Sequence, residues 1–245
     1  MARLSHQPAK ARQQKGETTS WFVYDRPVAE LRGVITDWGG VMTSPIADSV
    51  NAWLVADGID RRSYVAVMRQ WVMQAYSDGE DHNPIHALER GEWTNDEFES
   101  ALAKELVLED GGPVAGPGLL ARMFAGQTLD QEMLALFRKL KAGGVATGLL
   151  SNSWGGGYPT EIFPDMFDAV VISGEVGMRK PEPRIFLYAA QLLGLVPEEC
   201  VFIDDIEANI SAAEQLGFTG VLHSAAADTA QQVANLLGAS FSDCA

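Results

Sequence analysis

The chain has 245 residues, of which 47% are hydrophobic and 21% are charged, and its formal net charge is −15. This composition suits one globular domain with an insert, or two small domains, with enough apolar residues to form a core without disulfides. We expect neither nucleic acid nor acidic lipid as a partner, because both repel a strongly anionic protein.

The beginning of the chain differs from the rest. Residues 1–17 are basic and contain almost no apolar side chain, so we predict a largely disordered N-terminal extension over residues 1–30. No apolar stretch follows the basic residues, and no run approaches the roughly 18 apolar residues of a membrane span. The two cysteines, Cys200 and Cys244, lie in no CxxC motif or Cys/His cluster. We therefore expect a cytoplasmic protein without membrane partners.

The next elements in the chain are one strand and a helical region. The apolar stretch GVITD predicts a strand at residues 33–37 that ends on Asp37. No strand is evident in residues 45–127, where apolar residues recur at helical spacing between glycine-containing turns. The predicted helices of this region are residues 52–59, 64–76 and 95–106.

From residue 130 onward, strand and helix patterns alternate. The strands are predicted at 143–150 (after a turn), 168–173, 200–204 and 219–223, and the helices at 130–141, 181–193, 206–216 and 228–237. Short apolar strands that alternate with helices predict a parallel sheet covered on both faces. We therefore predict an α/β, Rossmann-like core domain made of residues 31–44 and 128–245, with an all-helical domain of residues 45–127 inserted into it.

Polar side chains occur where the predicted strands end. They are Asp37, the pair Ser151-Asn152, Lys180 in the loop after the third strand, and the pair Asp204-Asp205. In open parallel sheets, ligands bind at the carboxyl ends of the strands. A single Asp after a strand is often only the N-cap of the next helix. Four such strand ends, one of them followed by a lysine, are difficult to attribute to capping alone.

The residue types at these strand ends predict phosphoryl transfer. A free Asp has a pKa of about 3.9, so Asp37 is expected to be ionised and to attack phosphorus, forming an aspartyl-phosphate that water hydrolyses. Mg²⁺ held by Asp37, Asp204 and Asp205, with a backbone carbonyl at Gly39, would offset the repulsion between carboxylate and phosphate.

The remaining polar groups would bind the phosphoryl oxygens. Lys180 offers a positive charge, and the Ser151 hydroxyl offers a hydrogen-bond donor. The backbone N–H groups of Trp38 and Gly39 can approach a ligand closely, since the glycines that follow Trp38 carry no Cβ.

These residues also carry a family resemblance. The segments TDWGGVMT, LLSNS, GMRKPEPRIF and VFIDDIEAN, in this order, resemble the four motifs of the haloacid dehalogenase-like hydrolase superfamily. Over residues 31–238 the chain looks like its capped subfamily I, which includes the N-terminal phosphatase domain of bifunctional epoxide hydrolases. Residues 45–127 look like the helical cap of that subfamily. The resemblance implies an Mg²⁺ cofactor and a small phosphorylated substrate.

The resemblance also implies residue roles. Asp37 would be the nucleophile, and Lys180 would orient both the nucleophile and the phosphate. Ser151-Asn152 would bind phosphate, and Asp205, with Asp204, would hold Mg²⁺.

One position departs from the family pattern. Most phosphatases of the family have a second Asp two residues after the nucleophile as general acid, and this chain has Gly39, whose carbonyl would still face the metal. Losing a general acid costs about 10²–10⁴-fold in rate. Three explanations stay open: a substrate with a good leaving group, such as an acyl phosphate, or with its own proton; an acid from the cap, such as His82, His86 or Glu89; or phospho-ligand binding with little turnover.

The same residues bear on rival functions of the fold. Dehalogenases need no metal, and an acidic pair disfavours a halide product. Phosphonatases share the Asp-Trp pair but need a cap lysine, and Lys104 is predicted to be a solvated surface residue. A regulatory protein with a decayed site would be expected to lose the acidic pair or Lys180. We therefore predict an Mg²⁺-dependent phosphatase-type hydrolase, with a catalytically weak phospho-ligand-binding protein as the alternative.

The aromatic residues of the helical region could have two roles. At helical spacing they are more often part of a core than a surface on which a substrate stacks. They are Trp53, Trp71, Trp93, Tyr64 and Tyr76. The sequence leaves open a homodimer through this region.

Overall fold

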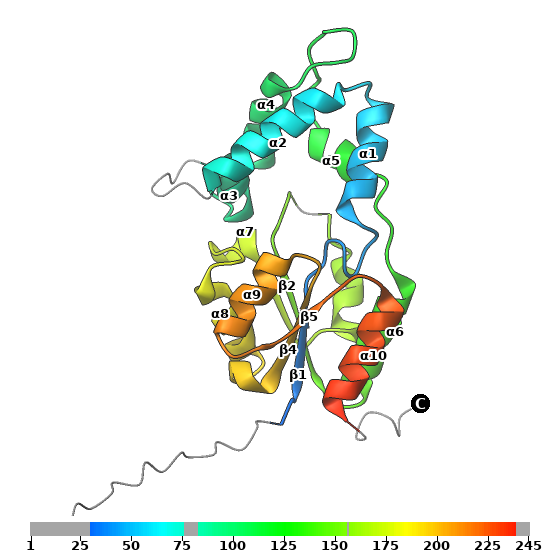
Figure 1. Cartoon of the computed structure of the whole chain (residues 1–245), viewed down its shortest axis with the longest axis vertical. Coiled ribbons are helices and arrows are strands. Elements are labelled where there is room, and N and C mark those ends of the chain that lie inside the picture. Colours follow the sequence, from blue (N-terminus) through cyan, green and yellow to red (C-terminus); the bar gives the residue numbers. More distant parts are fainter. Residues whose placement is uncertain (1–29, 76–82, 156, 239–245) are drawn as a thin grey trace, which may run out of the picture.

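The computed structural model describes residues 30–75, 83–155 and 157–238, so nearly all of the predicted N-terminal extension lies outside it. The described residues form a five-stranded parallel sheet with helices on both faces, and a separate group of helices lies beyond one edge of the sheet (Figure 1). The strand order is β3-β2-β1-β4-β5. The predicted α/β, Rossmann-like architecture is confirmed.

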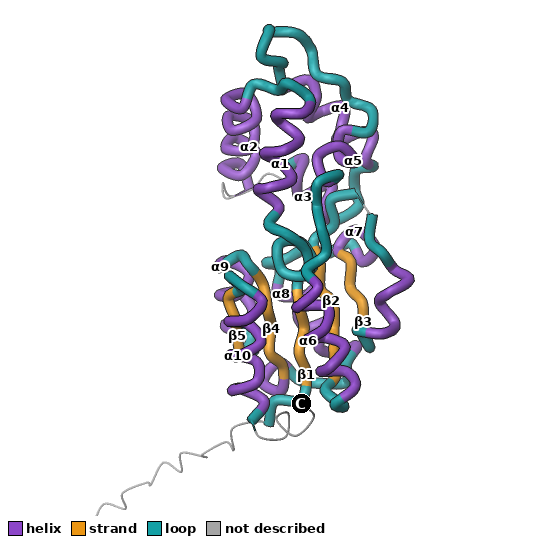
Figure 2. The backbone as a smooth tube through the Cα atoms, turned by 90° about the vertical axis from the view of Figure 1, so that its right-hand side faces the viewer, coloured by secondary structure: helices purple, strands orange, loops and turns teal. Residues whose placement is uncertain are grey.

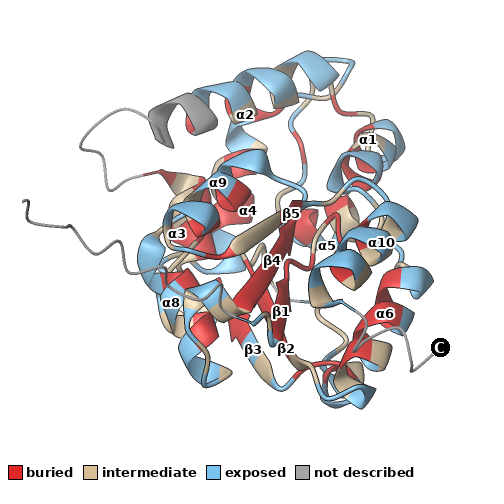
Figure 3. Ribbon diagram, turned by 60° about the horizontal axis from the view of Figure 1, so that its bottom comes forward, coloured by how far each residue is buried: buried red, intermediate tan, exposed pale blue. Residues whose placement is uncertain are grey.

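The central strands of the sheet bring distant parts of the chain together. Thr36 of β1 lies opposite Leu149 of β2 and Ile203 of β4. Every residue of β1 and β4 is buried, as Figure 3 shows, which is typical of parallel strands covered on both faces. The strands are β1 (Gly33–Thr36), β2 (Ala146–Ser151), β3 (Ala169–Ile172), β4 (Cys200–Asp204) and β5 (Thr219–Leu222).

Two pairs of helices cover the two faces of the sheet (Figure 1). On one face, α6 (Gln131–Ala142) and α10 (Ala226–Leu237) cover Val34. On the other, α8 (Pro183–Leu192) and α9 (Glu207–Gln215) cover Ile35, because successive strand residues point to opposite faces. The short elements of this sheet body are η1 (Thr160–Asp165), α7 (Ser173–Val176) and η2 (Pro197–Glu199).

The remaining helices form what we call the helical insert. They are α1 (Ile46–Ala56), α2 (Arg61–Ala75), α3 (Pro84–Glu89), α4 (Asn95–Glu105) and α5 (Leu119–Phe124). They pack around their own hydrophobic cluster, which includes the fully buried Phe98 and Leu102. Figure 2 shows the insert beyond one end of the strands, and this is their carboxyl end, because the parallel strand β1 leads directly into α1.

Two chain segments connect the insert with the sheet body, and they lie side by side. Thr43 forms an antiparallel bridge with Leu129. Beside it, the Ser44 N–H donates to the Thr128 carbonyl at 2.8 Å. We propose that the domain boundaries lie beside these paired residues, where the sequence predicts the insert of residues 45–127 to begin and end.

Two helices of the insert are absent from the sequence prediction. Both α3 and α5 have six residues, which is too short for a clear helical period. The start of α3 does carry a capping signal, since the Asn83 side chain accepts from the N–H groups of Ile85 and His86, and Pro84 follows it. Four of the five predicted aromatic residues belong to the interior of the insert: Trp53 and Trp71 are buried, and Tyr64 and Trp93 pack against the same cluster. Tyr76 lies outside the described residues.

The length and hydropathy of the helices bear on whether one of them could span a membrane. Among the residues that the structure describes, no helix combines the length and the apolar character needed to cross a bilayer.

Candidate active site

Three of the predicted site residues lie at the carboxyl ends of neighbouring strands. Asp37 directly follows β1, and its N–H donates to the Ile203 carbonyl at 2.8 Å, which extends the pairing of β1 and β4 by one residue. Ser151 ends β2, and Asp204 ends β4. The three positions therefore come together because β1 lies between β2 and β4.

Lys180 is the buried cation of this edge. Its side chain is only 1% exposed, and its Nζ lies 2.8 Å from Asp37 Oδ1 and 2.7 Å from Asp204 Oδ2. Burial alone would lower the pKa of the ammonium group, but the carboxylates of Asp204 and Asp37 more than offset this and raise it above its ordinary value. Lys180 is therefore a fixed positive charge between two aspartates.

The Asn152 amide holds the backbone of Lys180. The Lys180 N–H donates to Asn152 Oδ1 at 2.8 Å, and Asn152 Nδ2 donates to the Lys180 carbonyl at 3.0 Å. This pair of bonds joins the loop after β2 to the loop after α7. Asn152 therefore positions Lys180, and its predicted contact with phosphate stays a proposal.

The three acidic residues of the site, Asp37, Asp204 and Asp205, form what we call the acidic cluster. One carboxylate oxygen of each lies within 4.8 Å of the others. Asp204 is fully buried and accepts hydrogen bonds from Asn209 Nδ2 and from the Ile206 N–H. Such a set of oxygen donors, from three different positions, is the kind that hard divalent cations bind.

Burial and neighbouring negative charge raise the pKa values of two carboxyl groups in the acidic cluster. Burial raises the pKa of Asp37 to about 7, and the Asp204 carboxylate adds to this, whereas Lys180 opposes it. Burial and Asp204 likewise raise the pKa of Asp205. Three carboxylates face one ammonium group, so a divalent cation among them would favour their ionised forms. The cluster therefore fits Mg²⁺.

The turn after Asp37 requires a glycine at position 40. Gly40 has a φ of +80°, and a Cβ built there would lie 2.3 Å from Asp205 Oδ2. A Cβ at Gly39 would lie 2.9 Å from Cδ1 of Ile46. An apolar side chain of α1 thus faces the side of Gly39 on which a second aspartate would begin.

Two of the three cap candidates for a replacement acid, Glu89 and His86, do not line the pocket beside the site. Glu89 is buried, and its carboxylate accepts from Trp154 Nε1 at 3.0 Å and from Arg179 Nε at 2.5 Å. Glu89 and His86 are not among the described residues that line the adjoining pocket, and His82 lies outside the described residues. Glu89 therefore ties the helical insert to the sheet body rather than facing a ligand.

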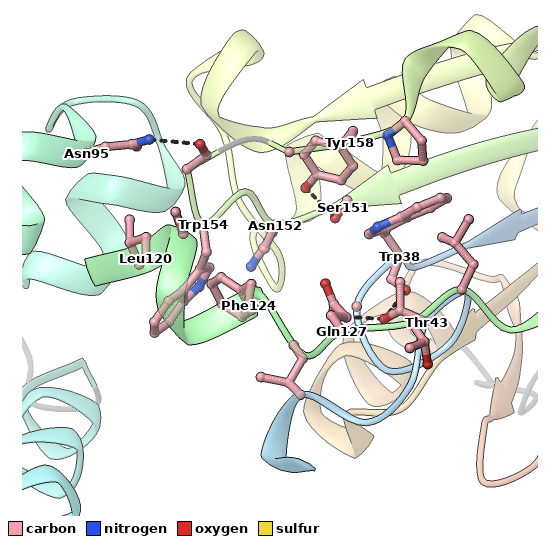
Figure 4. Close-up of a pocket in the computed structure, with 18 of the residues that line it drawn as sticks. Trp38, Thr43, Asn95, Leu120, Phe124, Gln127, Ser151, Asn152, Trp154 and Tyr158 are labelled. Carbon is pink, nitrogen blue, oxygen red and sulfur yellow. Dashed lines mark hydrogen bonds between the residues drawn. The ribbon is translucent and has the colours of Figure 1, made fainter. Parts of the chain in front are cut away.

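A cavity of about 580 Å³ lies between the helical insert and the edge of the sheet, and we call it the insert pocket (Figure 4). Trp38 and Gly39, which directly follow Asp37, line it together with Ser151 and Asn152. In Figure 4, Leu120, Phe124 and Trp154 lie on the opposite side from Trp38, Ser151 and Tyr158. The helical insert and the sheet body therefore both line the insert pocket, which lies next to the acidic cluster.

Two pocket residues were not singled out from the sequence. Tyr158 Oη lies 2.9 Å from Ser151 Oγ, and burial raises the pKa of Tyr158 to about 12, so its hydroxyl stays protonated. Trp154 follows β2 but packs against Phe98 and Phe124 of the insert, at ring-centroid distances of 5.6 and 6.4 Å. Their only sequence signal is their position within a glycine-rich loop after a strand end.

Lys104, the lysine considered for phosphonate cleavage, lies on α4 and is exposed. It does not line the insert pocket. The geometry therefore offers no support for a Schiff base from this residue.

A parallel sheet with an acidic cluster and a buried lysine at its carboxyl edge, next to a pocket lined in part by helices, is typical of a Rossmann-like enzyme. Comparison with known proteins specifies the class further. Residues 31–217 match the family model described as haloacid dehalogenase-like hydrolase, and the chain belongs to this family of hydrolases. The resemblance drawn from the four sequence motifs is thereby confirmed.

Two of the curated relatives share less than a third of their aligned residues with this chain. The chain is 28% identical to rat bifunctional epoxide hydrolase 2 over 131 residues, which is 50% of this chain and 24% of that protein. It is 28% identical over 118 residues to a sesquiterpene phosphatase of Aspergillus oryzae, which is 44% of this chain and 58% of that one. The chain thus spans less than two thirds of the length of either curated relative.

A solved structure shows the same fold. It is a mutant of a HAD family enzyme from Bacteroides thetaiotaomicron in complex with magnesium and inorganic phosphate. The TM-score is 0.57 at 22% identity, and the match covers 80% of this chain and 95% of the other.

Proposed function

We propose that the protein is an Mg²⁺-dependent phosphatase that hydrolyses small phosphorylated molecules through an aspartyl-phosphate on Asp37. The observation that carries the proposal is the Lys180 ammonium group, held 2.8 Å from Asp37 and 2.7 Å from Asp204 inside the acidic cluster. The phosphatase among the relatives, and the magnesium and phosphate in the related structure, support the same chemistry.

Each residue then has a defined task. Asp37 attacks phosphorus, the bond from phosphorus to the ester oxygen breaks, and water later hydrolyses the acyl phosphate to free phosphate and Asp37. Lys180 favours the ionised form of Asp37 and balances charge on the phosphoryl oxygens, to which Ser151 donates a hydrogen bond. Magnesium, held by the acidic cluster and the Gly39 carbonyl, would supply positive charge for the phosphoryl group.

The leaving oxygen needs a proton that Gly39 cannot provide. Tyr158 lines the insert pocket, and its protonated hydroxyl lies beside Ser151. We assign Tyr158 as the proton donor to the leaving oxygen. A tyrosine of raised pKa is a weaker acid than aspartic acid, so esters with poor leaving groups should be turned over more slowly than acyl phosphates.

The proposal is tested by phosphate release from acetyl phosphate and p-nitrophenyl phosphate, with Mg²⁺ and with excess chelator. We expect release only with Mg²⁺, and its loss in D37N. The matched control is D96N, because Asp96 is an exposed aspartate in the first turn of α4. Binding of phosphate without release from either compound would contradict turnover and favour the phospho-ligand-binding alternative. Equal release by D37N and the native chain would exclude Asp37 as nucleophile.

A further inference from the structure

The wall of the insert pocket differs in charge from the acidic cluster beside it. Among the described residues that line the pocket there is no lysine, arginine or histidine. The charged side chain on this wall is Glu99, which is 5% exposed. Its carboxylate accepts from the N–H groups of Gly118 at 2.7 Å and of Leu120 at 3.0 Å. The wall therefore carries negative charge and offers no described basic side chain to an anion.

The polar side chains of the pocket are largely engaged with the protein itself. Gln127 Nε2 donates to Thr43 Oγ1 at 2.9 Å, and Asn95 Nδ2 donates to the Gly155 carbonyl at 2.8 Å. Figure 4 shows both pairs at the boundary of the pocket. Much of the remaining wall is apolar or aromatic, and its members include Trp38, Ile46, Leu120, Phe124, Leu129 and Trp154.

The buried cation of the site is not available to a second anion. Lys180 is 1% exposed, and two carboxylates lie within 2.8 Å of its Nζ. A carboxylate or second phosphate on the substrate would therefore enter the pocket without a partner of opposite charge, beside Glu99. Removing such a charge from water is strongly unfavourable.

Resting on the proposed phosphatase function, we propose that the substrate is the monophosphate ester of an uncharged, largely apolar alcohol. The phosphate lies at the acidic cluster, and the organic part fills the insert pocket between Trp38 on one side and Phe124 and Trp154 on the other. The cavity of about 580 Å³ falls within the range of about 300–1,000 Å³ of pockets that bind small organic molecules. Sugar bisphosphates, phosphorylated amino acids and phosphorylated carboxylic acids are excluded as preferred substrates.

The test compares two esters that differ in charge and little in leaving group. Benzyl phosphate and 4-carboxybenzyl phosphate are incubated with the full-length protein and Mg²⁺, with acetyl phosphate as a third substrate. We expect kcat/KM to be about tenfold or more higher for benzyl phosphate, because the carboxylate would be buried unpaired. Equal efficiency, or cleavage of acetyl phosphate alone, overturns this inference and leaves the phosphatase proposal intact. Failure to cleave all three compounds overturns the phosphatase proposal itself.

A second measurement tests the preference by adding a cation to the pocket. Leu129 lines the pocket and is 36% exposed, so L129R places a guanidinium group at the pocket without burying it fully. The matched control is L187R on α8, where the leucine is 44% exposed and does not line the pocket. We expect L129R to raise kcat/KM for 4-carboxybenzyl phosphate relative to benzyl phosphate several-fold, and L187R to leave the ratio unchanged. An unchanged ratio in L129R contradicts the lack of a basic side chain in the pocket as the source of selectivity.

Discussion

The acidic cluster and the insert pocket lie next to each other, yet they are built from different kinds of contact. The acidic cluster comes from side chains that directly follow neighbouring strands, and ion pairs to Lys180 hold two of its members. The wall of the insert pocket comes from loops and helices far apart in the chain, and ring packing and hydrogen bonds to backbone hold it. Under the proposed function, the acidic cluster would determine the reaction, whereas the pocket wall would determine which molecule is accepted.

The largest expected effect comes from removing the cation of the acidic cluster. In K180M, Asp37 and Asp204 lose their ion pair at buried positions, and breaking a buried pair costs about 3–5 kcal/mol of unfolding free energy. We expect phosphate release to fall by at least about 10²–10³-fold for every substrate, as when one charge-stabilising donor is lost. Urea unfolding and acetyl phosphate hydrolysis measure both effects.

The control for this variant is K104M, since Lys104 is an exposed lysine of the helical insert. A K180M protein that keeps native stability and turnover would mean that the two aspartates do not depend on the lysine.

The second prediction tests whether Tyr158 protonates the leaving oxygen or only supports the binding of phosphate. Tyr158 lies beside Ser151 and lines the pocket. If it protonates the leaving oxygen, Y158F should lower kcat for benzyl phosphate by about 10²-fold and leave kcat for acetyl phosphate nearly unchanged. Equal losses on both substrates would show that Tyr158 acts only through Ser151.

The third prediction concerns magnesium and the acidic cluster. A ligand at 100 times its Kd stabilises the folded state by about 2.7 kcal/mol, so Mg²⁺ should raise the Tm of the native protein. D205N removes one of the three carboxylates of the cluster and should reduce this shift. Thermal unfolding with and without Mg²⁺ measures it.

D96N serves again as the exposed control for D205N. An undiminished magnesium shift in D205N would place the ion outside the acidic cluster.

The smallest effect is expected from the contact that joins the helical insert to the sheet body. Glu89 accepts from Trp154 and Arg179, and hydrogen bonds to charged groups contribute about 1.5–3 kcal/mol. E89Q should lower the unfolding free energy by no more than this and should raise KM for benzyl phosphate, whose organic part needs the pocket wall. Steady-state kinetics with both substrates, and E105Q on the exposed end of α4 as control, test this.

KM for acetyl phosphate should change little in E89Q, because that molecule has almost no organic part for the wall to contact. Parallel increases in KM for both substrates would mean that Glu89 supports the acidic cluster as well as the pocket.

The sequence by itself determined the parallel sheet and the location of the acidic cluster. Apolar strands that alternate with helices leave few other arrangements, and a polar residue directly after such a strand must lie at the carboxyl edge. Asp37, Ser151 and Asp204 were predicted on that basis, and they lie at one edge of the sheet together with Lys180, which was predicted in the loop after the third strand.

Only the tertiary structure decided which aromatic residues are core and which line the pocket. Trp53 and Trp71 are buried inside the helical insert, whereas Trp154, from a loop after β2, packs into the insert and lines the pocket. Glu89 meets Trp154 across 65 residues of chain. Local periodicity reports only which face of a helix is apolar, so it cannot show which distant segment covers that face.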